Sequence, residues 1–355
     1  MTYETSLIVP AARGDYLVER TADVIGRINA DEHSIIVADK FFEGQVDNPK
    51  TIFIEAVEER KTLETVGEIC EELAVRRLPR NGHLVALGGG IVQDVSTLVA
   101  SLYMRGISWS YVPTTLLGMV DSAVGGKSSI NVGVSKNLVG NIYPPDKILI
   151  DIGLCRSLTR VDVLCGLSEA FKILFCGGSS KIEEFLDQQP DVQSANLEEL
   201  VWHSLKTKVE FLRVDEFDRA ERRLLNFGHT FGHALETGSN YKIPHGIAVA
   251  YGMWMAFRWS AVSGTPLASS ALVQWIQSVD DELARSDLSN IEVNLLACRS
   301  GFERDKKHSA THFRLIVPTE KTVEIIEVER SPSSLDQIMA VMRSIVNESQ
   351  FLEGV

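Results

Sequence analysis

The chain has 355 residues, of which 45% are apolar and 23% charged, the composition of an ordinary globular protein. This length allows two domains, each with its own core. The formal net charge of −13 argues against a nucleic-acid partner, because phosphate backbones bind faces rich in Lys and Arg. A small anionic ligand is still compatible with this charge where a few cations converge locally.

Cysteine usage and hydropathy indicate the compartment. The five cysteines are odd in number and lack C-x-x-C spacing, so they predict buried thiols in a reducing environment. No apolar run reaches the roughly 18–20 residues of a membrane span, and the N-terminus does not resemble a signal peptide. We therefore expect a cytoplasmic protein without a membrane partner.

The N-terminal part has the pattern of alternating strands and helices. Short apolar runs bounded by Gly, Pro or Asp predict buried strands at 34–38, 51–57, 83–87, 108–113 and 147–151. Apolar residues at helical spacing predict helices at 62–77 and 91–103. Such alternation favours a doubly wound, mostly parallel α/β domain, which we expect over residues 1–155.

The pattern changes after this point. Helical periodicity dominates residues 156–355, where we expect a mainly α-helical domain containing a single strand pair, 313–317 with 322–328. The predicted helices are 160–176, 181–187, 196–215, 221–238, 246–263, 269–285 and 335–346. No repeat or long linker separates the two parts.

Gly88, Gly89 and Gly90 stand between a predicted strand and a predicted helix. Backbone N–H groups at a helix N-terminus on the carboxyl edge of a parallel sheet suit a pyrophosphate. The alternative is a tight turn, since the tripeptide is not G-x-G-x-x-G. Asp94, near the start of the helix, is either a first-turn carboxylate or an acceptor for a cofactor hydroxyl.

Glycines, hydroxyls, amides and lysines are dense between residues 113 and 140, where apolar periodicity is weak. This composition predicts a loop that wraps an anion, and the alternative is a solvated surface loop. Thr114 and Thr115 favour the first interpretation, because they end a strand on the edge where open α/β sheets bind ligands.

A histidine-rich stretch gives the strongest chemical signal. His229 and His233 lie four residues apart in a predicted helix, so both imidazoles can reach one ligand. A glycine precedes each, and His245 stands between Pro244 and Gly246, in a turn that can return it to the same site. The alternative is that these are surface or core histidines.

Glu169 and Lys172 interrupt an otherwise apolar predicted helix. Such residues are rarely buried unless they are paired or bind a ligand, and the alternative is a surface ion pair. Glu169, His229 and His245 form an oxygen and two-nitrogen set that leaves positions open on a zinc-like ion. Lys208 and Arg222 add cations to the helical region.

Taken together, these motifs resemble 3-dehydroquinate synthase and its sugar phosphate cyclase relatives. They cover most of residues 55–320 in the family's order, with a weaker match at Glu58-x-x-Lys61. The motifs are Gly88-Gly-Gly followed by Asp94, Tyr103-Met-Arg105, Val112-Pro-Thr-Thr, Val120-Asp-Ser-x-Val-Gly-Gly-Lys127, Lys136-Asn137, Glu169-x-x-Lys172, Asn226-x-Gly-His229-Thr-Phe-Gly-His233-Ala-x-Glu236, His245-Gly and Asp305-Lys-Lys307.

The resemblance implies an NAD- and metal-dependent lyase, usually a homodimer, with a cleft between its domains. Glu169, His229 and His245 would bind zinc or cobalt. NAD would be held by Asp39, Glu58, Lys61, Gly88, Gly89, Gly90, Asp94, Thr114, Thr115 and Asp121, with Lys136 near the same face. The substrate phosphate would meet Lys127, Asn137, Asn226, His233, either Lys306 or Lys307, and Arg105 of a neighbouring subunit. Lys172, Lys208 and Arg222 would bind the hydroxyls and carboxylate.

The implied reaction converts 3-deoxy-arabino-heptulosonate 7-phosphate, a phosphorylated sugar acid, to 3-dehydroquinate and phosphate in the shikimate route to aromatic amino acids. It runs through transient oxidation by NAD, phosphate elimination, reduction and an intramolecular aldol closure. The segment Ser128–Gly133 departs from the family's usual Thr-Gly-x-Asn-His-Pro, and Gln93 with Ser96-Thr97-Leu98 replaces a second glycine-rich segment. These changes leave open a related cyclase of the amino-dehydroquinate, valiolone or deoxy-inosose type, although Arg222 and Asn226 favour an acidic substrate.

Two other interpretations belong to different classes. A metal-dependent polyol dehydrogenase shares the two-domain plan and a glycine-rich NAD edge, but it would release NADH and would not need so many cations for phosphate and carboxylate. A ligand-binding pseudoenzyme is the second, and the intact metal set argues against it.

Overall fold

The computed structural model describes residues 5–133, 135–188, 197–263, 270–286, 288, 290–319 and 322–354. The chain divides into two compact units, Met1–Ser157 with Lys208–Phe217, and Leu158–Thr207 with Asp218–Val355. The division differs from the predicted domains in one segment, because Lys208–Phe217 belongs to the first unit. Side chains of this segment have partners there: Lys208 pairs with Asp121, and Glu216 accepts a hydrogen bond from the backbone N–H of Ala12.

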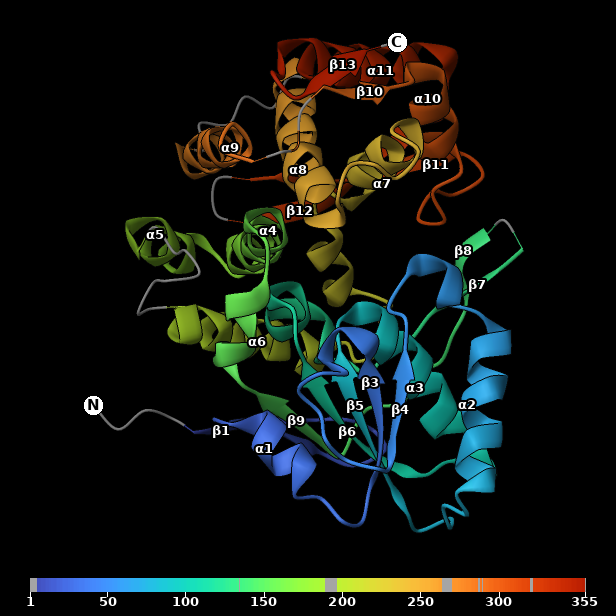
Figure 1. The fold of residues 1–355 in the computed structure, drawn as a ribbon. Helices are drawn as coiled ribbons and strands as arrows, with labels where there is room; N and C mark the ends of the chain where they lie inside the picture. Colours follow the sequence, from blue (N-terminus) through green and yellow to red (C-terminus); the bar gives the residue numbers. More distant parts are fainter. Residues whose placement is uncertain are drawn as a thin grey trace. The chain divides into compact units, whose positions relative to one another are not determined.

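A seven-stranded sheet in the order β1-β2-β9-β6-β5-β3-β4 forms the centre of the first unit (Figure 1). All its neighbouring strands are parallel except β1 and β2, which pair antiparallel. The strands are β1 (Ser6–Val9), β2 (Tyr16–Arg20), β3 (Ile35–Asp39), β4 (Thr51–Ile54), β5 (His83–Gly88), β6 (Ser108–Pro113) and β9 (Lys147–Ile150), and the helices are α1 (Val24–Asn29), α2 (Leu63–Val75) and α3 (Gly90–Leu102). The mostly parallel α/β fold predicted from the alternation is therefore confirmed.

Differences in burial explain which strands of the sheet could be predicted from the sequence and which were missed. Val24 and Ile28 of α1 form a buried cluster with Ile36 and Ala38 of β3, and α3 packs against β5 and β6. Three of the predicted strands, β3, β5 and β6, are mostly buried, and this burial gives the continuous apolar runs by which they were predicted. The edge strand β4 and the strand β9 were predicted as well, although they are only partly buried. The prediction missed β1 and its neighbour β2 because both are short and only partly buried, so they carry no such run.

The predicted anion-wrapping loop contains an antiparallel hairpin, so its description as a plain loop was wrong. Strand β7 (Ile130–Val132) pairs with β8 (Ser135–Val139). A bridge between Lys127 and Ile142 extends the pairing. Backbone contact at its base requires a glycine, because a Cβ on Gly140 would lie 1.9 Å from the Ser128 carbonyl oxygen. The strands are short and β8 is mostly exposed, so the sequence has no apolar periodicity there that would predict them.

The second unit is mainly helical, as predicted. The buried helix α8 packs against α4, α7, α9, α11 and the hairpin strand β11 (Figure 1). The helices are α4 (Arg160–Cys176), α5 (Ser179–Gln188), α6 (Leu197–Val214, whose last residues belong to the first unit), α7 (His229–Gly238), α8 (His245–Val262), α9 (Ser270–Leu283), α10 (Leu295–Glu303) and α11 (Pro332–Glu348). The strand pair β11 (His312–Pro318) with β12 (Val323–Glu329) is antiparallel. A second pair, β10 (Ile291–Val293) with β13 (Leu352–Gly354), was missed because each strand has three residues.

The predicted helix 221–238 is interrupted. Residues Glu221–Asn226 form the 3-10 helix η6, and the α-helix starts again at His229. The break lies at Gly228, whose φ of 80° is left-handed and whose added Cβ would lie 2.7 Å from the Val249 carbonyl oxygen. The interruption makes His229 the first residue of α7 instead of an interior one.

Two general features complete the description. Among the helices of the described residues, none is both long and apolar enough to span a membrane. All five cysteines are free, and all except the half-buried Cys70 are buried.

Candidate active site

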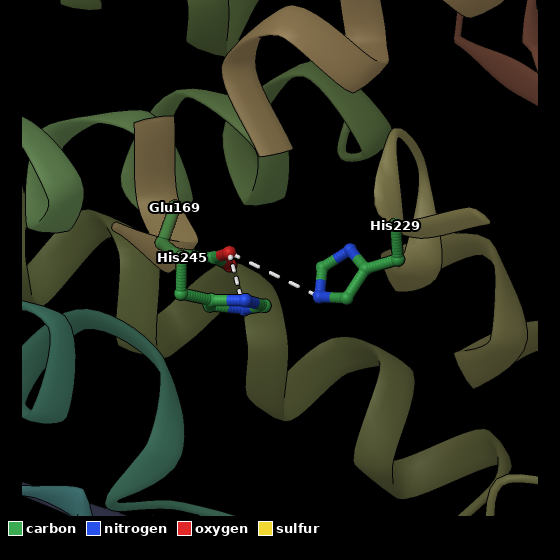
Figure 2. Close-up of side chains that lie close together, drawn as sticks. All are labelled: Glu169, His229 and His245. Carbon is green, nitrogen blue, oxygen red and sulfur yellow. Dashed lines mark ion pairs between the residues drawn. The ribbon is translucent and has the colours of Figure 1, made fainter. Parts of the chain in front are cut away.

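Three potential metal ligands converge in the second unit from three different helices. Glu169 lies within α4, and His229 and His245 are the first residues of α7 and α8. We call these three residues the histidine cluster. Their ligand atoms all lie within 4.8 Å of one another, and Figure 2 shows both imidazoles near the Glu169 carboxylate. Glu169 Oε1 is 3.5 Å from His245 Nε2 and 3.9 Å from His229 Nε2.

Glycines at the helix crossings allow this convergence. A Cβ on Gly246 would lie 2.3 Å from the Cys165 carbonyl oxygen, so α8 meets α4 backbone to backbone. A Cβ on Gly252 would lie 2.0 Å from the Gly228 carbonyl oxygen, where α8 meets the start of α7. Only glycine permits such approaches. The glycines therefore set the distances among the three ligands.

Lys172 forms an ion pair with the second oxygen of Glu169. The Lys172 side chain is 2% exposed and that of Glu169 is 0% exposed, so the alternative of a surface pair is wrong. Burying two charges has a large desolvation cost unless each is paired or ligated. The pairing uses Glu169 Oε2 and leaves Oε1 directed toward the histidines.

The two histidines of the cluster have different electrostatic environments. Burial, with the nearby positive charge of Lys172, holds the pKa of His229 well below its usual value, which keeps the imidazole neutral. At His245, burial lowers the pKa, but the hydrogen bond to Glu236 and the charges of Glu169 and Glu236 outweigh it and raise the pKa. In both residues Nδ1 faces an acceptor: Phe227 O at 3.4 Å for His229, and Glu236 Oε1 at 3.1 Å for His245.

The donor set fits a zinc-like ion. Metal–ligand bonds of about 2.0–2.1 Å in a tetrahedral site separate neighbouring ligand atoms by roughly 3.4 Å, close to the spacings of 3.5 and 3.9 Å about Glu169 Oε1. Three protein ligands leave coordination positions for a substrate. His233, Glu236 and His245 form a second group with potential ligand atoms within 4.8 Å of one another, and it shares His245 with the first.

A second ionic cluster holds two of the predicted phosphate-binding residues. The Asp305 carboxylate, 4% exposed, accepts hydrogen bonds from Lys307 Nζ at 2.9 and 3.2 Å and lies 3.8 Å from His233 Nδ1. Burial raises the pKa of Asp305, but His233 and the charge and hydrogen bonds of Lys307 outweigh it and hold this pKa below its usual value. The Asp305 carboxylate thus holds the Lys307 side chain in place, while Lys306 is exposed.

Arg222 and Asn226 lie on the 3-10 helix η6 that precedes α7. Arg222 is 4% exposed, a degree of burial that a guanidinium reaches only with partners. Asn226 is half-buried, and its side-chain amide donates to the Arg223 carbonyl oxygen at 3.1 Å. Their positions just before His229 place both residues in the same unit as the histidine cluster.

The predicted nucleotide edge lies in the first unit. Gly88 ends β5, and Gly89 and Gly90 begin α3 without a side-chain cap. The backbone N–H of Thr114, after β6, donates to Gly88 O at 3.1 Å, and Thr115 Oγ1 accepts from Gly118 N at 3.1 Å. A Cβ added to Gly90 would meet nothing within 4 Å, so the N-terminus of α3 is open. An open helix N-terminus at this edge fits a pyrophosphate.

Six polar side chains of the first unit form what we call the Lys61 network: Glu58, Lys61, Asp94, Ser129, Asn131 and Asn137. Lys61 Nζ lies 2.7 Å from both Asp94 Oδ2 and Asn137 Oδ1. Ser129 donates its N–H to Asp94 and its hydroxyl to Asn137, at 2.9 and 2.8 Å. Asn131 connects Asn137 with Glu58: its Oδ1 accepts from Asn137 N at 2.9 Å, and its Nδ2 donates to Glu58 Oε1 at 2.8 Å.

The remaining predicted residues of this unit have varied surroundings. Lys208 pairs with the Asp121 carboxylate and donates to the Asp121 carbonyl oxygen at 2.6 Å, and both residues belong to the first unit. Lys136 lies 3.9 Å from Glu58 Oε1. Asp39, at the end of β3, accepts from Phe41 N at 3.0 Å. Lys127 and Arg105 are exposed, and Arg105 has a left-handed φ of 68°.

Sequence reasoning gave no role to Glu236 or to Asp305, although each carboxylate holds a predicted site residue. For Glu236 a signal was present: His229, His233 and Glu236 have the i, i+4, i+7 spacing of one helix face. No comparable signal marked Asp305, because its contact with His233 joins residues 72 positions apart in the chain (305 − 233).

Two family models match consecutive parts of the chain. Residues 51–164 match the family model described as 3-dehydroquinate synthase N-terminal, and residues 166–308 the one described as 3-dehydroquinate synthase C-terminal. The 3-dehydroquinate synthase of Streptococcus pyogenes serotype M49 (strain NZ131) is 34% identical over 261 residues, 73% of each chain.

Two solved structures share the fold. A 2-deoxy-scyllo-inosose synthase complexed with carbaglucose-6-phosphate, NAD+ and Co2+ has a TM-score of 0.79 at 21% identity, covering 95% of this chain and 100% of that one. A 2-epi-5-epi-valiolone synthase from Streptomyces hygroscopicus subsp. jinggangensis 5008, with NAD+ and Zn2+ bound, has a TM-score of 0.78 at 23% identity, covering 98% and 100%.

Proposed function

Because the chain belongs to the 3-dehydroquinate synthase family of sugar phosphate cyclases, we propose that it converts 3-deoxy-arabino-heptulosonate 7-phosphate to 3-dehydroquinate and phosphate. The enzyme would use NAD and a divalent metal, zinc or cobalt, as the two solved cyclases contain. This assignment would place it in the shikimate route, and as a homodimer it would let Arg105 reach a neighbouring subunit's substrate.

The observation that carries the proposal is the histidine cluster, buried beside Lys172. Glu169, His229 and His245 would hold the metal, and the residues at the open N-terminus of α3 would hold the NAD pyrophosphate. When bound, the metal supplies Lewis-acid polarisation of a substrate hydroxyl, and NAD supplies a hydride acceptor that is restored within each turnover.

The protein's own cationic side chains would stabilise the negative charge that develops on the substrate. Lys307, held by Asp305, would bind the phosphate together with His233. Fixed cations stabilise a leaving phosphate without reorganising during the reaction. Lys172, held in place by its ion pair with Glu169, would donate to a substrate hydroxyl.

The acidic substrate is proposed from Arg222 and Asn226. A buried guanidinium suits bidentate recognition of a carboxylate, which valiolone- and inosose-type substrates lack. We expect Arg222→Ala to lower kcat/KM for the heptulosonate by about 100-fold, the scale of a lost charge-assisted pair. Turnover of a carboxylate-free analogue would change little, and an equal loss on both substrates would contradict this role.

The decisive experiment measures inorganic phosphate released from 3-deoxy-arabino-heptulosonate 7-phosphate with catalytic NAD and zinc, and identifies the product by mass. Phosphate together with 3-dehydroquinate supports the proposal. Release only from the amino analogue or from sedoheptulose 7-phosphate would keep the cyclase site and change the substrate. Net accumulation of NADH with a polyol, and no phosphate, would indicate a dehydrogenase instead.

A further inference from the structure

We propose that Glu236 is a positioning residue that orients His245 for metal binding by accepting the hydrogen of its Nδ1. This inference rests on the proposed function in one respect, namely that the histidine cluster binds a divalent metal. Glu236 itself belongs to neither the ligand set nor the predicted substrate contacts.

The geometry of His245 carries the argument. Its Nδ1 lies 3.1 Å from Glu236 Oε1, and its Nε2 lies 3.5 Å from Glu169 Oε1. A carboxylate that accepts from Nδ1–H selects the tautomer whose Nε2 carries a lone pair. That lone pair then faces the other two members of the histidine cluster, which is the orientation a metal ligand needs.

The location of Glu236 makes this hydrogen bond well defined. Glu236 lies near the end of α7, and its side chain is 15% exposed. Its carbonyl oxygen accepts from Tyr241 N at 2.7 Å and Ser239 Oγ at 3.2 Å, so the backbone there is held as well. His245 begins the neighbouring helix α8 and is 37% exposed. A half-exposed imidazole gains little orientation from packing, so the hydrogen bond matters more.

His229 provides an internal comparison. Its Nδ1 faces the backbone carbonyl of Phe227 at 3.4 Å, and its side chain is 13% exposed. The Nδ1 of His229 therefore faces the main chain, whereas the Nδ1 of His245 faces a side chain. The dependence on a removable partner makes the role of Glu236 testable by substitution.

One other arrangement uses the same residues. His233, Glu236 and His245 can together ligate an ion directly, since their donor atoms also lie within 4.8 Å of one another. The cluster with Glu169 is the better site, because its carboxylate is fully buried and directs Oε1 toward Nε2 of both histidines. In that arrangement Glu236 supports a ligand and His233 stays free of the metal.

The test measures the zinc affinity of the full-length protein by competition with a chromophoric chelator. We expect Glu236→Ala to weaken zinc binding by about 10- to 100-fold, the usual effect of losing such a partner. Glu236→Gln retains an oxygen that can accept the Nδ1 hydrogen and should recover most of the affinity. His233→Asn serves as the matched control and should bind zinc as the wild type does.

The outcomes separate this inference from its premise. Wild-type affinity in Glu236→Ala, or equal losses in Glu236→Ala and Glu236→Gln, would overturn the positioning role. A loss in His233→Asn as large as in Glu236→Ala would instead assign the ion to the second group and also overturn it. Absence of zinc binding by the wild type would refute the proposed metal site itself. Visible absorption of the cobalt-substituted protein provides a second readout, since a reoriented His245 would change the ligand field.

Discussion

The Lys61 network and the histidine cluster are both polar groups that include a buried ion pair, but they are held together differently. In the Lys61 network, side chains from a strand–helix connection, a helix and a hairpin bond to one another through at least one cation and several amides. In the histidine cluster, the ligands start from three helices whose backbones meet at glycines. The first arrangement ties connecting segments together, and the second holds donor atoms apart at fixed distances.

This difference predicts different consequences of substitution. Removing Lys61 from its network leaves the mostly buried Asp94 carboxylate without this cation, which costs folding free energy. Removing a ligand of the histidine cluster leaves the helices in place and costs metal affinity. Substitution of a glycine at a helix crossing should affect both stability and metal binding.

The largest effect is expected for His245→Ala. Loss of a ligand should weaken zinc binding by more than about 100-fold, since losing an outer partner already costs 10- to 100-fold. Without several kcal/mol of Lewis-acid assistance, phosphate release should fall by about 10³-fold or more. Zinc content after dialysis and the rate of phosphate release measure these effects. Full zinc occupancy in this variant would rule out His245 as a ligand.

Gly252→Ala tests whether the helix crossing sets the site. The added methyl group would lie 2.0 Å from the Gly228 carbonyl oxygen, so α7 and α8 must separate. We expect the free energy of unfolding to fall by about 3 kcal/mol, with weaker zinc binding. Urea unfolding of the metal-free protein measures the first effect. The control is Gly67→Ala in α2, where a Cβ meets nothing within 4 Å and stability should rise slightly.

Lys61→Met tests how much the Lys61 network contributes to stability. Lys61 and Asp94 are 8% and 18% exposed, so removing the lysine leaves a mostly buried carboxylate without this cation. We expect the free energy of unfolding to fall by about 2 kcal/mol, less than for a fully buried pair because Ser129 N–H still bonds Asp94. Calorimetry without NAD measures the change, and adding Asp94→Asn should restore part of it.

The control for that experiment is Lys40→Met. Lys40 pairs with Glu55 at 3.2 Å, but the two side chains are 52% and 63% exposed, so the loss should be below about 1 kcal/mol. Equal losses in the two lysine variants would show that burial of the Lys61 network contributes nothing.

Asp305→Asn tests how much the Asp305 carboxylate contributes to stability and how this contribution depends on pH. Because folding lowers the pKa of Asp305, its contribution to stability is present above its unfolded pKa of about 4 and is lost as pH falls toward the folded value. The variant should be less stable by about 1.5 kcal/mol at pH 7, and the difference should shrink between about pH 5 and pH 2. Urea unfolding over this range measures it. Asp336→Asn, at an exposed pair with Arg299, should show no such trend.

The smallest effect is expected for Ser129→Ala. This change removes the hydroxyl that donates to Asn137 Oδ1 at 2.8 Å and keeps the Ser129 N–H bond to Asp94. A single partly exposed hydrogen bond contributes about 0.5 kcal/mol. Thermal unfolding measures the change, and a loss above about 2 kcal/mol would show that this hydroxyl has a larger part in the network than one hydrogen bond.

Much of the fold and the site was predictable from local pattern. The central strands and the helix Arg160–Cys176 have strong apolar periodicity or continuous apolar runs, because their burial is nearly complete. The edge strand β1, its neighbour β2 and the three-residue strands β10 and β13 lack such patterns, so they were missed. The candidate metal ligands could be proposed from the sequence because Glu, His and glycine in one helical region are chemically unusual.

Tertiary structure decided which of these residues meet. Lys208 pairs with Asp121, 87 residues away. Glu236 reaches His245 across the turn between two helices, and Asp305 selects Lys307 over its neighbour Lys306. Sequence spacing determines which residues share a face of one helix or strand. Contacts between elements depend on how backbones approach, and here that approach is set by close packing at Gly228, Gly246 and Gly252.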